Sequence, residues 1–392
     1  MNISFGIITK DLLDTISIDK FLDNSKEYGH DVYSVIVTYS RHIDYEVVER
    51  LRKKVNLEII KINDHDIMCD QLADMRMSNK SIKNLINCSR VEENGIVPYG
   101  TNRNSVIMKG ILTGVDVLVF VDTDVFPSLL VEDGGIVKSI KVDFLGRHLE
   151  YLKKDDVYIT TSDYSGYYII PPMNFDGMEE LFRGIQKNTS YDFIKDSSIH
   201  NCFVGDNYHN RKVFETNKIL GGNVAIKLKI FRKIIPFFSS SYMVNGERFL
   251  TRGEDTLMGI EINRLKTHKC IDIDTKIFHN TYSNYPQIPD ILNDKNIQDR
   301  FFYACMGWIG RNPFLNWING EDVSLKRIKQ ANALKIGSKE IARYLNDDRF
   351  LILEEAIEIS YDRLDIVIKE YRDLTISWKE FIVKHDKWRG NI

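Results

Sequence analysis

Apolar runs of strand length alternate with amphipathic stretches of helix length in the N-terminal part of the chain. Residues 3–9, Val32–Tyr39 and Leu57–Ile62 are rich in Ile and Val, which is typical of strands buried on both faces. The segments between them, 17–28 and 44–54, carry apolar residues at helical spacing. Strands that alternate with helices predict βαβ units with right-handed crossovers and a parallel sheet.

The clearest apolar run leads into an acidic pair. Residues 115–121 are apolar except for Asp116, and Asp122 and Asp124 follow directly. Residues two apart in an extended chain point to the same side, so both carboxylates are aimed at one point. That point lies at the carboxyl end of a strand, where open α/β sheets bind ligands. Adjacent carboxylates repel each other unless a cation lies between them, and Mg²⁺ or Mn²⁺ would be a suitable cation. The alternative interpretation is an acidic turn after a core strand.

A candidate anion site precedes this strand. Gly100 permits an unusual backbone angle, and Thr101 or Asn102 could cap a helix over 103–112. Arg103 and its neighbour Asn104 lie in the first turn of that helix. Free amides, the helix dipole and a guanidinium all favour a diphosphate, although a plain capped helix with a solvated arginine fits the same pattern.

The middle of the chain predicts two strands and a loop. Val157–Thr161 and Tyr167–Ile170 have strand composition, and Tyr164 and the nearby tyrosines could line a sugar-binding cleft or form the core and rim of a sheet. Before them, residues 131–135 form an acidic loop with two glycines, and a helix is expected from about Ile140.

Two glycine motifs stand further along the chain. Gly221 and Gly222 precede a short strand, and paired glycines either let the backbone approach a ligand closely or form a tight turn. Gly253 precedes Glu254 and Asp255 at the start of a predicted helix. Acidic residues favour a helix start in any case, but a carboxylate fixed there can also act as a base or hold an acceptor.

A strand over 270–278 ends at His279. A single histidine after a strand is more often structural, and it becomes a ligand candidate only if the strand brings it to the Asp pair. Beyond about residue 288 the patterns become helical, over 294–310, 324–332, 338–346, 349–360 and 363–385. We therefore predict a catalytic domain over 1–287 and a helical C-terminal subdomain over 288–392. By default the apolar faces of these helices pack on the catalytic domain, but they would also suit a homodimer interface or part of an acceptor site.

Composition narrows the class of protein. The chain has 392 residues, 43% of them hydrophobic and 28% charged, with a formal net charge of −3, which does not suggest nucleic-acid binding. The five cysteines are scattered and form no C-x-x-C pair, which indicates a reducing compartment and no zinc site. The N-terminal apolar run is too short for a signal peptide, and no stretch approaches the length of a membrane span. We expect a cytoplasmic protein.

The order of these motifs resembles the GT-A class of nucleotide-sugar glycosyltransferases over about residues 1–285. The resemblance implies a Rossmann-like, mixed and mostly parallel sheet flanked by helices, in the α/β class. It also implies a divalent metal, Mn²⁺ or Mg²⁺, a nucleotide-sugar donor as co-substrate, and a hydroxyl acceptor, which would be a glycan, a polyol acid, a lipid-linked sugar or a protein. The reaction would move the sugar from the nucleotide diphosphate to that acceptor.

The resemblance also suggests roles for residues. Asp122, Asp124 and His279 would hold the metal, and Glu254 and Asp255 would match the acidic motif near the acceptor. The predicted donor-binding residues are Thr9, Tyr39, Arg103, Asn104, Asp122, Gly221, Gly222 and Asn223.

Two branches of the class compete. The Gly-Glu-Asp-Thr run is similar to inverting family 2-type enzymes, in which an Asp serves as base, and this would be Asp255. The Leu-Gly-Gly run and the Gly-x-Asp-Thr-Leu run, followed by a metal-binding His, are similar to mannosylglycerate synthase and its relatives, which are retaining. Those enzymes tend to carry an acid where this chain has Asn223, so acceptor and stereochemistry stay open.

Other classes fit fewer of the motifs. A haloacid-dehalogenase-type phosphatase or phosphotransferase would use Asp122 as its nucleophile, but that family usually places the motif on the first strand, and here three predicted strands precede it. A nucleotidyltransferase would normally show a glycine-rich, lysine-containing loop after the first strand, and this is absent after residue 9.

Overall fold

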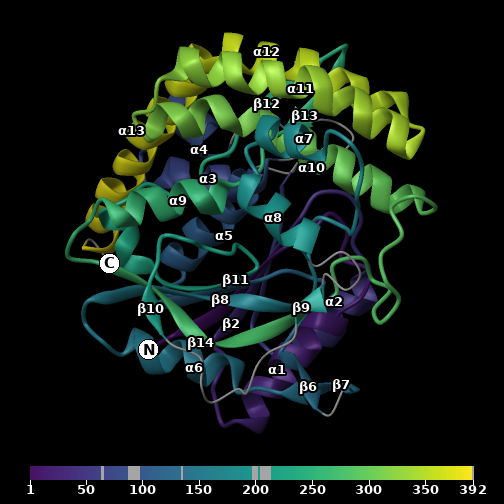
Figure 1. Ribbon diagram of the computed structural model, residues 1–392. Helices are drawn as coiled ribbons and strands as arrows, with labels where there is room; N and C mark the ends of the chain where they lie inside the picture. Colours follow the sequence, from purple (N-terminus) through teal and green to yellow (C-terminus); the bar gives the residue numbers. More distant parts are fainter. Residues whose placement is uncertain (63–65, 87–97, 134–135, 197–201, 204–212, 391–392) are drawn as a thin grey trace.

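The computed structural model describes residues 1–62, 66–86, 98–133, 136–196, 202–203 and 213–390 (Figure 1). Its centre is a ten-stranded sheet in the order β10-β14-β8-β11-β4-β1-β2-β3, with β5 paired to β14 and β9 paired to β8. The strands of this sheet are β1 (Ile3–Ile8), β2 (Ser34–Tyr39), β3 (Leu57–Lys61), β4 (Val117–Val121), β5 (Val125–Phe126), β8 (Val157–Tyr167), β9 (Cys202–Phe203), β10 (Phe214–Glu215), β11 (Asn223–Lys227) and β14 (Lys269–His279).

The long strands run in one direction except for one. Strands β3, β2, β1 and β4 are parallel neighbours, and β8 and β14 are parallel to each other. Strand β11 lies between the two groups and is antiparallel to β4 and β8, so that Asn223 faces Val121. The predicted fold class, a mixed and mostly parallel sheet flanked by helices, is confirmed. The reversal of β11 brings the start of this strand to the edge where β4 ends.

Alternation along the strands divides the core in two. In β4, Val117, Val119 and Val121 face one side of the sheet, while Leu118 and Phe120 face the other, and all five are fully or almost fully buried. Helices α1 (Ile16–Glu27), α2 (Tyr45–Arg52) and α6 (Phe144–Leu152) cover the valine side. Helices α3 (Asp66–Asp74), α4 (Asn79–Ile86), α5 (Tyr99–Leu112), α9 (Glu254–Asn263) and α13 (Leu364–Arg389) contribute to the other side.

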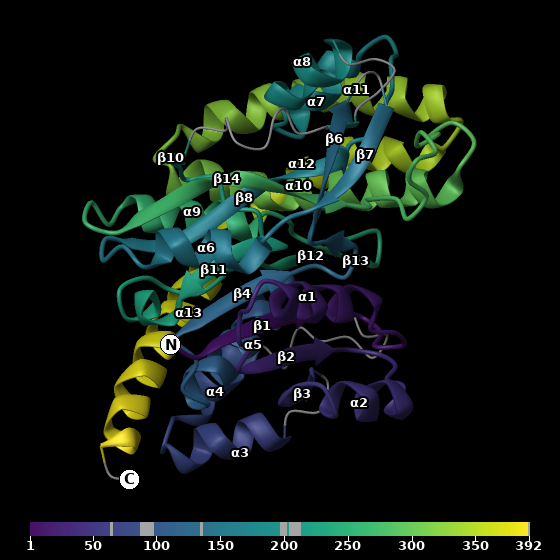
Figure 2. The same cartoon turned by 90° about the horizontal axis from the view of Figure 1, so that it is seen from below.

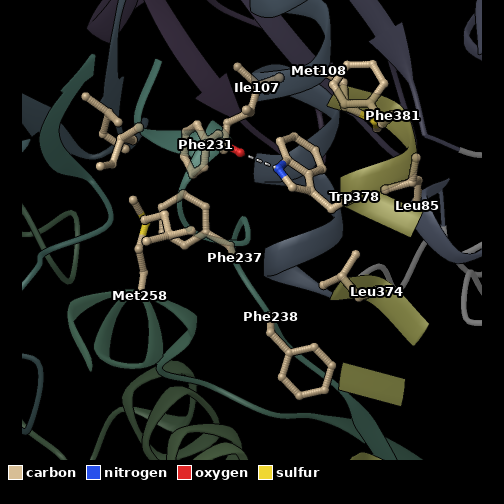
Figure 3. Close-up of a cluster of buried hydrophobic side chains, with 14 of the residues drawn as sticks. Leu85, Ile107, Met108, Phe231, Phe237, Phe238, Met258, Leu374, Trp378 and Phe381 are labelled. Carbon is tan, nitrogen blue, oxygen red and sulfur yellow. Dashed lines mark hydrogen bonds between the residues drawn. The ribbon is translucent and has the colours of Figure 1, made fainter. Parts of the chain in front are cut away.

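The C-terminal helix belongs to this second core. Trp378 of α13 is 1% exposed, and its indole Nε1 donates to the carbonyl oxygen of Phe231 at 2.9 Å (Figure 3). Its ring meets Phe231 and Phe381 at centroid distances of 5.9 and 5.1 Å. The hydrophobic cluster that includes Trp378 reaches Leu118 of β4. Apolar packing is therefore continuous from the C-terminal helix to the central sheet.

The remaining elements complete the helical end of the molecule. Figure 1 shows α10 (Lys295–Ile318), α11 (Val323–Leu345) and α12 (Leu353–Asp362) across the top, far from the hairpin β6 (Ser128–Asp133) and β7 (Ile136–Lys141). Figure 2, the view from below, shows α13 descending past α4 towards the C-terminus. The other elements are α7 (Met178–Gly184), α8 (Asn188–Asp196), the 3-10 helices η2 (Leu228–Arg232) and η3 (Asp348–Ile352), and the hairpin β12 (Ser241–Val244) and β13 (Glu247–Leu250).

Several element predictions were wrong for physical reasons. The strand expected at Val157–Thr161 continues to Tyr167 as β8, because β14 pairs with the polar residues beyond Thr161, as in the pair of Ser165 and Phe278. Of the strand expected at Tyr167–Ile170, only Tyr167 lies in a strand. The helix expected from about Ile140 begins only at Phe144, after the β6–β7 hairpin.

The helical region is more continuous than the sequence pattern indicates. The patterns over 324–332 and 338–346 belong to one helix, α11, and α10 continues to Ile318 with Pro313 inside it. No helix in the described part of the chain combines the length and the apolar composition that a membrane span requires.

Candidate active site

The carboxyl edge of the sheet gathers most of the predicted residues. Strand β4 ends directly before Asp122, and β14 ends at His279. Helix α5 leads into β4, so its first turns, with Arg103, lie at the same edge. Gly221 comes just before the reversed strand β11. Segments far apart in the sequence therefore meet because of the strand order.

Asp124 contacts two cationic or potentially cationic side chains. Its Oδ2 lies 3.2 Å from Nε2 of His279 and 3.4 Å from Nη2 of Arg300. The backbone fixes this contact, because β5 pairs with the end of β14 and the amide of Asn280 donates to the carbonyl oxygen of Asp124 at 2.8 Å. Tyr164 of β8 packs on His279 with a centroid distance of 4.7 Å.

Arg103 connects three parts of the site. Its Nη1 donates to the carbonyl oxygen of Gly221 at 2.6 Å, its Nη2 lies 3.5 Å from Oδ1 of Asp122, and its Nε lies 3.3 Å from Oε1 of Glu254. The side chain is 5% exposed, and its guanidinium lies 5.2 Å from the ring centre of Phe120. This arginine is therefore a buried cation that is paired with carboxylates, and the alternative of a solvated arginine is wrong.

The two glycines allow the chain to approach these groups closely. A Cβ on Gly222 would lie 2.1 Å from Oδ2 of Asp122, and a Cβ on Gly221 would lie 2.6 Å from Nη2 of Arg103. The amide of Gly221 also donates to Oδ2 of Asp255 at 3.2 Å. Any larger residue at position 222 would displace the Asp122 carboxylate, so the close approach is a property of this pair of glycines.

Helix α9 places its first acidic residues at the same edge. Gly253 precedes it with φ of 91°, a left-handed conformation that favours glycine. Glu254 is 7% exposed and pairs with Arg103, whereas Asp255 is partly exposed beside Gly221. Of the two predicted catalytic carboxylates, Asp255 is therefore the more accessible.

The environment shifts the pKa values of the two carboxylates of the D-x-D motif in opposite directions. Burial raises the pKa of Asp122, and the negative charge of Asp124 adds to this although Arg103 opposes it. Burial acts in the same direction on Asp124, but its hydrogen bond and charge interaction with His279 and the charge of Arg300 outweigh it and lower the pKa. Burial also raises the pKa of Glu254, with the help of Asp255. Asp124 is thus the carboxylate held in its ionised form.

The donor set suits a divalent ion only in part. Across the residues that the structure describes, no three or more His, Cys, Asp or Glu side chains stand close enough together to hold a metal ion. Asp124 and His279 do stand together, and a carboxylate with an imidazole is a donor pair that Mn²⁺ accepts. Asp122 lies beside Arg103 and Gly222 instead. The three-residue metal set therefore stays a prediction, and two of its members are in contact.

Two of the predicted donor residues, Thr9 and Asn104, form hydrogen bonds within the protein. Thr9 directly follows β1, and Tyr39 is the last residue of β2, so both lie at the carboxyl edge of the sheet. The hydroxyl of Thr9 donates to the carbonyl oxygen of Asp11 at 2.7 Å. Asn104 is buried, and its amide nitrogen donates to the carbonyl oxygen of Phe237 at 2.8 Å.

Asn223 faces away from the Asp pair. Its side chain is fully buried, its Nδ2 donates to the carbonyl oxygen of Ser162 at 3.0 Å, and its Oδ1 lies 3.3 Å from Nε2 of His148 on α6. It shares the face of Val121, its partner across the strands. These contacts engage both ends of its amide within the core.

Arg300 has no counterpart among the predicted residues. It lies on α10, in the part of the chain expected to be a separate helical subdomain, and no motif surrounds it. The only available signal was its position three turns before Arg311 on one helix, which places both on one face. Its contact with Asp124 depends on how α10 crosses the sheet.

The chain is similar to some solved structures at low sequence identity and low TM-scores. No family model and no curated protein sequence matches the chain. Among solved structures, glucosyl-3-phosphoglycerate synthase from Mycobacterium tuberculosis, with Mn²⁺, uridine diphosphate and glucosyl-3-phosphoglycerate, is 11% identical at a TM-score of 0.39, over 82% of this chain and 81% of that one. TarS 1–349 from S. aureus is 12% identical at a TM-score of 0.41, over 95% of this chain and 91% of that one. At these TM-scores the similarities carry no conclusion about this chain, and the proposed function rests on the geometry of the site.

Proposed function

We propose that this chain is a metal-dependent glycosyltransferase that moves a sugar from a nucleotide diphosphate sugar to a hydroxyl acceptor. One observation carries the proposal: Arg103 connects Asp122, Gly221 and Glu254 at the carboxyl edge of the sheet, where Asp124 also meets His279. An acidic pair, an imidazole, close-approaching glycines and a buried guanidinium at one edge suit a diphosphate, a divalent ion and a sugar.

Asp124 and His279 would hold the metal, with Asp122 as the predicted third ligand. When bound, a divalent ion supplies Lewis-acid stabilisation of the negative charge on the leaving diphosphate. Carboxylate and phosphate oxygens are the ligands that Mg²⁺ and Mn²⁺ prefer, so the donor itself would complete the coordination.

Arg103 and Arg300 would balance the charge of the diphosphate. Both guanidiniums already lie against the Asp pair, at 3.5 and 3.4 Å, so no large rearrangement is needed for them to act there. Donors fixed in advance where charge develops stabilise a transition state more than mobile ones do. The nucleoside would lie along the ends of β1 and β2, near Thr9 and Tyr39.

Asp255 would act on the acceptor. In the transfer, the acceptor hydroxyl oxygen forms a bond to the anomeric carbon, and the bond from that carbon to the diphosphate oxygen breaks. In an inverting reaction Asp255 takes the hydroxyl proton, whereas in a retaining reaction the leaving diphosphate oxygen would take the proton and Asp255 would position the acceptor or the donor. Its partial exposure beside Gly221 supports either role.

The test is a proton NMR screen of the purified protein with Mn²⁺ or Mg²⁺ and UDP-, GDP-, ADP- and dTDP-sugars. Slow hydrolysis of one donor is expected, and both chelation and Asp124→Asn should abolish it. The variant Lys339→Gln, at an exposed position of α11, is the matched control and should keep the wild-type rate. If every donor is left intact and a phosphate monoester is hydrolysed instead, the proposal fails and Asp122 becomes a candidate nucleophile.

A further inference from the structure

Three cationic side chains stand near Asp255 without a carboxylate partner within 4 Å among the described residues. They are Lys187, Arg252 and Arg311, which come from the end of α7, the segment before α9 and the middle of α10. Electrostatic interactions link Lys187 with both arginines and with Asp255. None of the three is among the site residues that the sequence predicts.

Lys187 is held at the edge of the site by the end of α7. Its amide donates to the carbonyl oxygen of Phe182 at 2.8 Å, after Gln186 has turned the chain with φ of 57°. Its Nζ lies 4.6 Å from the ring centre of Trp308, which is 4% exposed on α10. The ammonium therefore rests on an aromatic face rather than extending into solvent.

Arg311 lies one helical turn further along α10. It is 5% exposed, and a Cβ on Gly253 would lie 2.7 Å from its Cδ and 2.8 Å from its Nη1, so the guanidinium packs beneath the start of α9. Its Nη2 donates to Oδ1 of Asn312 at 3.2 Å, and its buried Nε has no hydrogen-bond partner. A buried guanidinium with an unused donor is costly unless a ligand completes it.

Arg252 packs against α10 at Gly307. Its amide donates to the carbonyl oxygen of Gly307 at 3.0 Å, and a Cβ on Gly307 would lie 2.6 Å from its Cγ. Its guanidinium lies 5.8 Å from the ring centre of Tyr99. The glycine in α10 thus makes room for this arginine beside Trp308.

Other carboxylates in this region are already paired with cationic side chains. Glu254 pairs with Arg103, Asp124 pairs with Arg300 and His279, and Asp163 pairs with Lys218 at 2.7 Å. Among the described residues, Asp255 is the carboxylate that interacts with both Lys187 and Arg311, and Glu254 adds a weaker interaction with Arg311. The excess of positive charge sits in a partly buried site, where a missing counter-charge is unfavourable.

We propose that the acceptor carries an anionic group, a phosphate or a carboxylate, which Lys187, Arg252 and Arg311 bind while the acceptor hydroxyl lies near Asp255. This inference rests on the proposed transferase function and defines its substrate class. The anionic group keeps all its bonds in the reaction, since only the hydroxyl oxygen bonds to the sugar. Burial and the two arginines lower the pKa of Lys187, and burial lowers that of Arg311 to about 10, although Asp255 opposes the shift in both and Glu254 opposes it in Arg311.

The first experiment compares acceptors that differ only in charge. Neutral polyols, their monophosphates and their carboxylic acids are offered with the donor that the wild-type protein hydrolyses. Transfer to a charged member is expected, and the preferred member identifies phosphate or carboxylate as the group. Lys187→Gln and Arg252→Gln should each raise the KM for that acceptor about 10- to 100-fold, while hydrolysis of the donor alone stays within about twofold of wild type. The control Lys218→Gln, a nearby lysine that is paired with Asp163, should keep the wild-type KM.

The second experiment needs no transferase activity. Inorganic phosphate binding is measured by calorimetry on the wild-type protein, on the Lys187→Gln/Arg252→Gln double variant and on Lys218→Gln. A loss of affinity of at least tenfold in the double variant alone supports the site. The conservative Arg311→Lys variant keeps one charge at the buried position and should bind phosphate with intermediate affinity.

The outcomes separate this inference from the proposed function. If a donor is hydrolysed but the neutral acceptor is preferred and phosphate binds the double variant as tightly as wild type, the anionic acceptor is ruled out and the transferase stands. If no donor is hydrolysed but the double variant loses phosphate affinity, the transferase proposal fails and the anion site stands.

Discussion

Arg300 and Asp124 are 176 positions apart in the sequence, yet Nη2 of the arginine lies 3.4 Å from Oδ2 of the aspartate. The contact joins α10 to the turn after β4, so the C-terminal helical region contributes a charged group to the predicted metal and diphosphate site. It also lowers the pKa of Asp124, together with the stronger effect of His279.

Replacement of Arg300 should weaken donor binding. Arg300→Gln removes one positive charge beside the diphosphate, and we expect the donor affinity to fall about 10-fold, the usual size for a partly exposed ionic contact to an anion. Arg300→Lys should recover part of the loss. Titration calorimetry with the nucleoside diphosphate and Mn²⁺ measures the effect, and unchanged affinity in Arg300→Gln would place the diphosphate elsewhere.

Gly222→Ala should abolish turnover without unfolding the protein. The added methyl group would lie 2.1 Å from Oδ2 of Asp122, so the carboxylate has to move. We expect at least a 100-fold lower rate of donor hydrolysis at a nearly unchanged melting temperature. Gly390→Ala is the control, because its nearest neighbour would be at an ordinary 3.5 Å. Wild-type activity in Gly222→Ala would show that Asp122 is not positioned by this contact.

Acceptor binding should depend on pH through Lys187. Burial is the main reason why the pKa of this lysine falls to about 8. The positive charges of Arg311 on α10, Arg252 before α9 and Lys218 lower it further, whereas the negative charge of Asp255 raises it. The ammonium is therefore mostly charged at pH 7 and mostly neutral at pH 9, so the KM for an anionic acceptor should rise about 5- to 10-fold across this interval. A carboxylate acceptor is used because its own charge is constant there. Initial rates in Lys187→Gln should show a flat profile, and an equal slope in both proteins would exclude Lys187.

Stability in mild acid should reflect His148. This residue is fully buried beneath the sheet, and burial lowers its pKa to about 4 despite the hydrogen bond with Asn223. The unfolded chain binds a proton near the ordinary pKa of 6.5, whereas the folded protein does so only near 4, so stability is lost as the pH falls from 6.5 to 4. The loss from this group is about 3 kcal/mol. His148→Gln keeps a hydrogen-bonding side chain but does not titrate, and urea unfolding at pH 7 and pH 4 should show a smaller loss for it than for wild type. Equal losses in the two proteins would contradict this assignment.

The C-terminal helices should unfold together with the sheet. Trp378 is buried in the cluster that reaches Leu118, so Trp378→Ala removes packing from both parts and should lower the free energy of unfolding by about 3–5 kcal/mol. Trp378→Phe keeps most of the packing and loses the bond to Phe231, for about 1–2 kcal/mol. Calorimetry should show a single transition in both variants. A separate early transition would support the predicted division near residue 288.

The N-terminal strands and the D-x-D position were predictable because their signals are local. The alternation in β4, with valines on one face and Leu118 and Phe120 on the other, follows from the period of an extended chain. The same residues place Asp122 and Asp124 at the carboxyl end of the strand. The glycine pair and the acidic start of α9 were equally visible, since a close approach and a helix start each require particular residue types.

Tertiary structure decided what depends on contacts across the chain. The single strand β8 exists because β14 pairs with its polar middle, and propensity alone favoured a break there. The orientation of Asn223 towards His148 follows from the register of β11 against β4, which no local pattern specifies.

The sequence by itself thus determined the sheet-based fold class and the motifs at its edge, since strand periodicity, helix starts and glycine positions are properties of neighbouring residues. Only the folded chain decided which charges meet. Arg300 of α10 reaches Asp124, and Lys187 interacts with Arg252, Arg311 and Asp255, although these residues lie in segments far apart in the chain. Long-range packing of helices fixes such contacts, and a charged residue on a helix carries no local mark of the partner that it will meet.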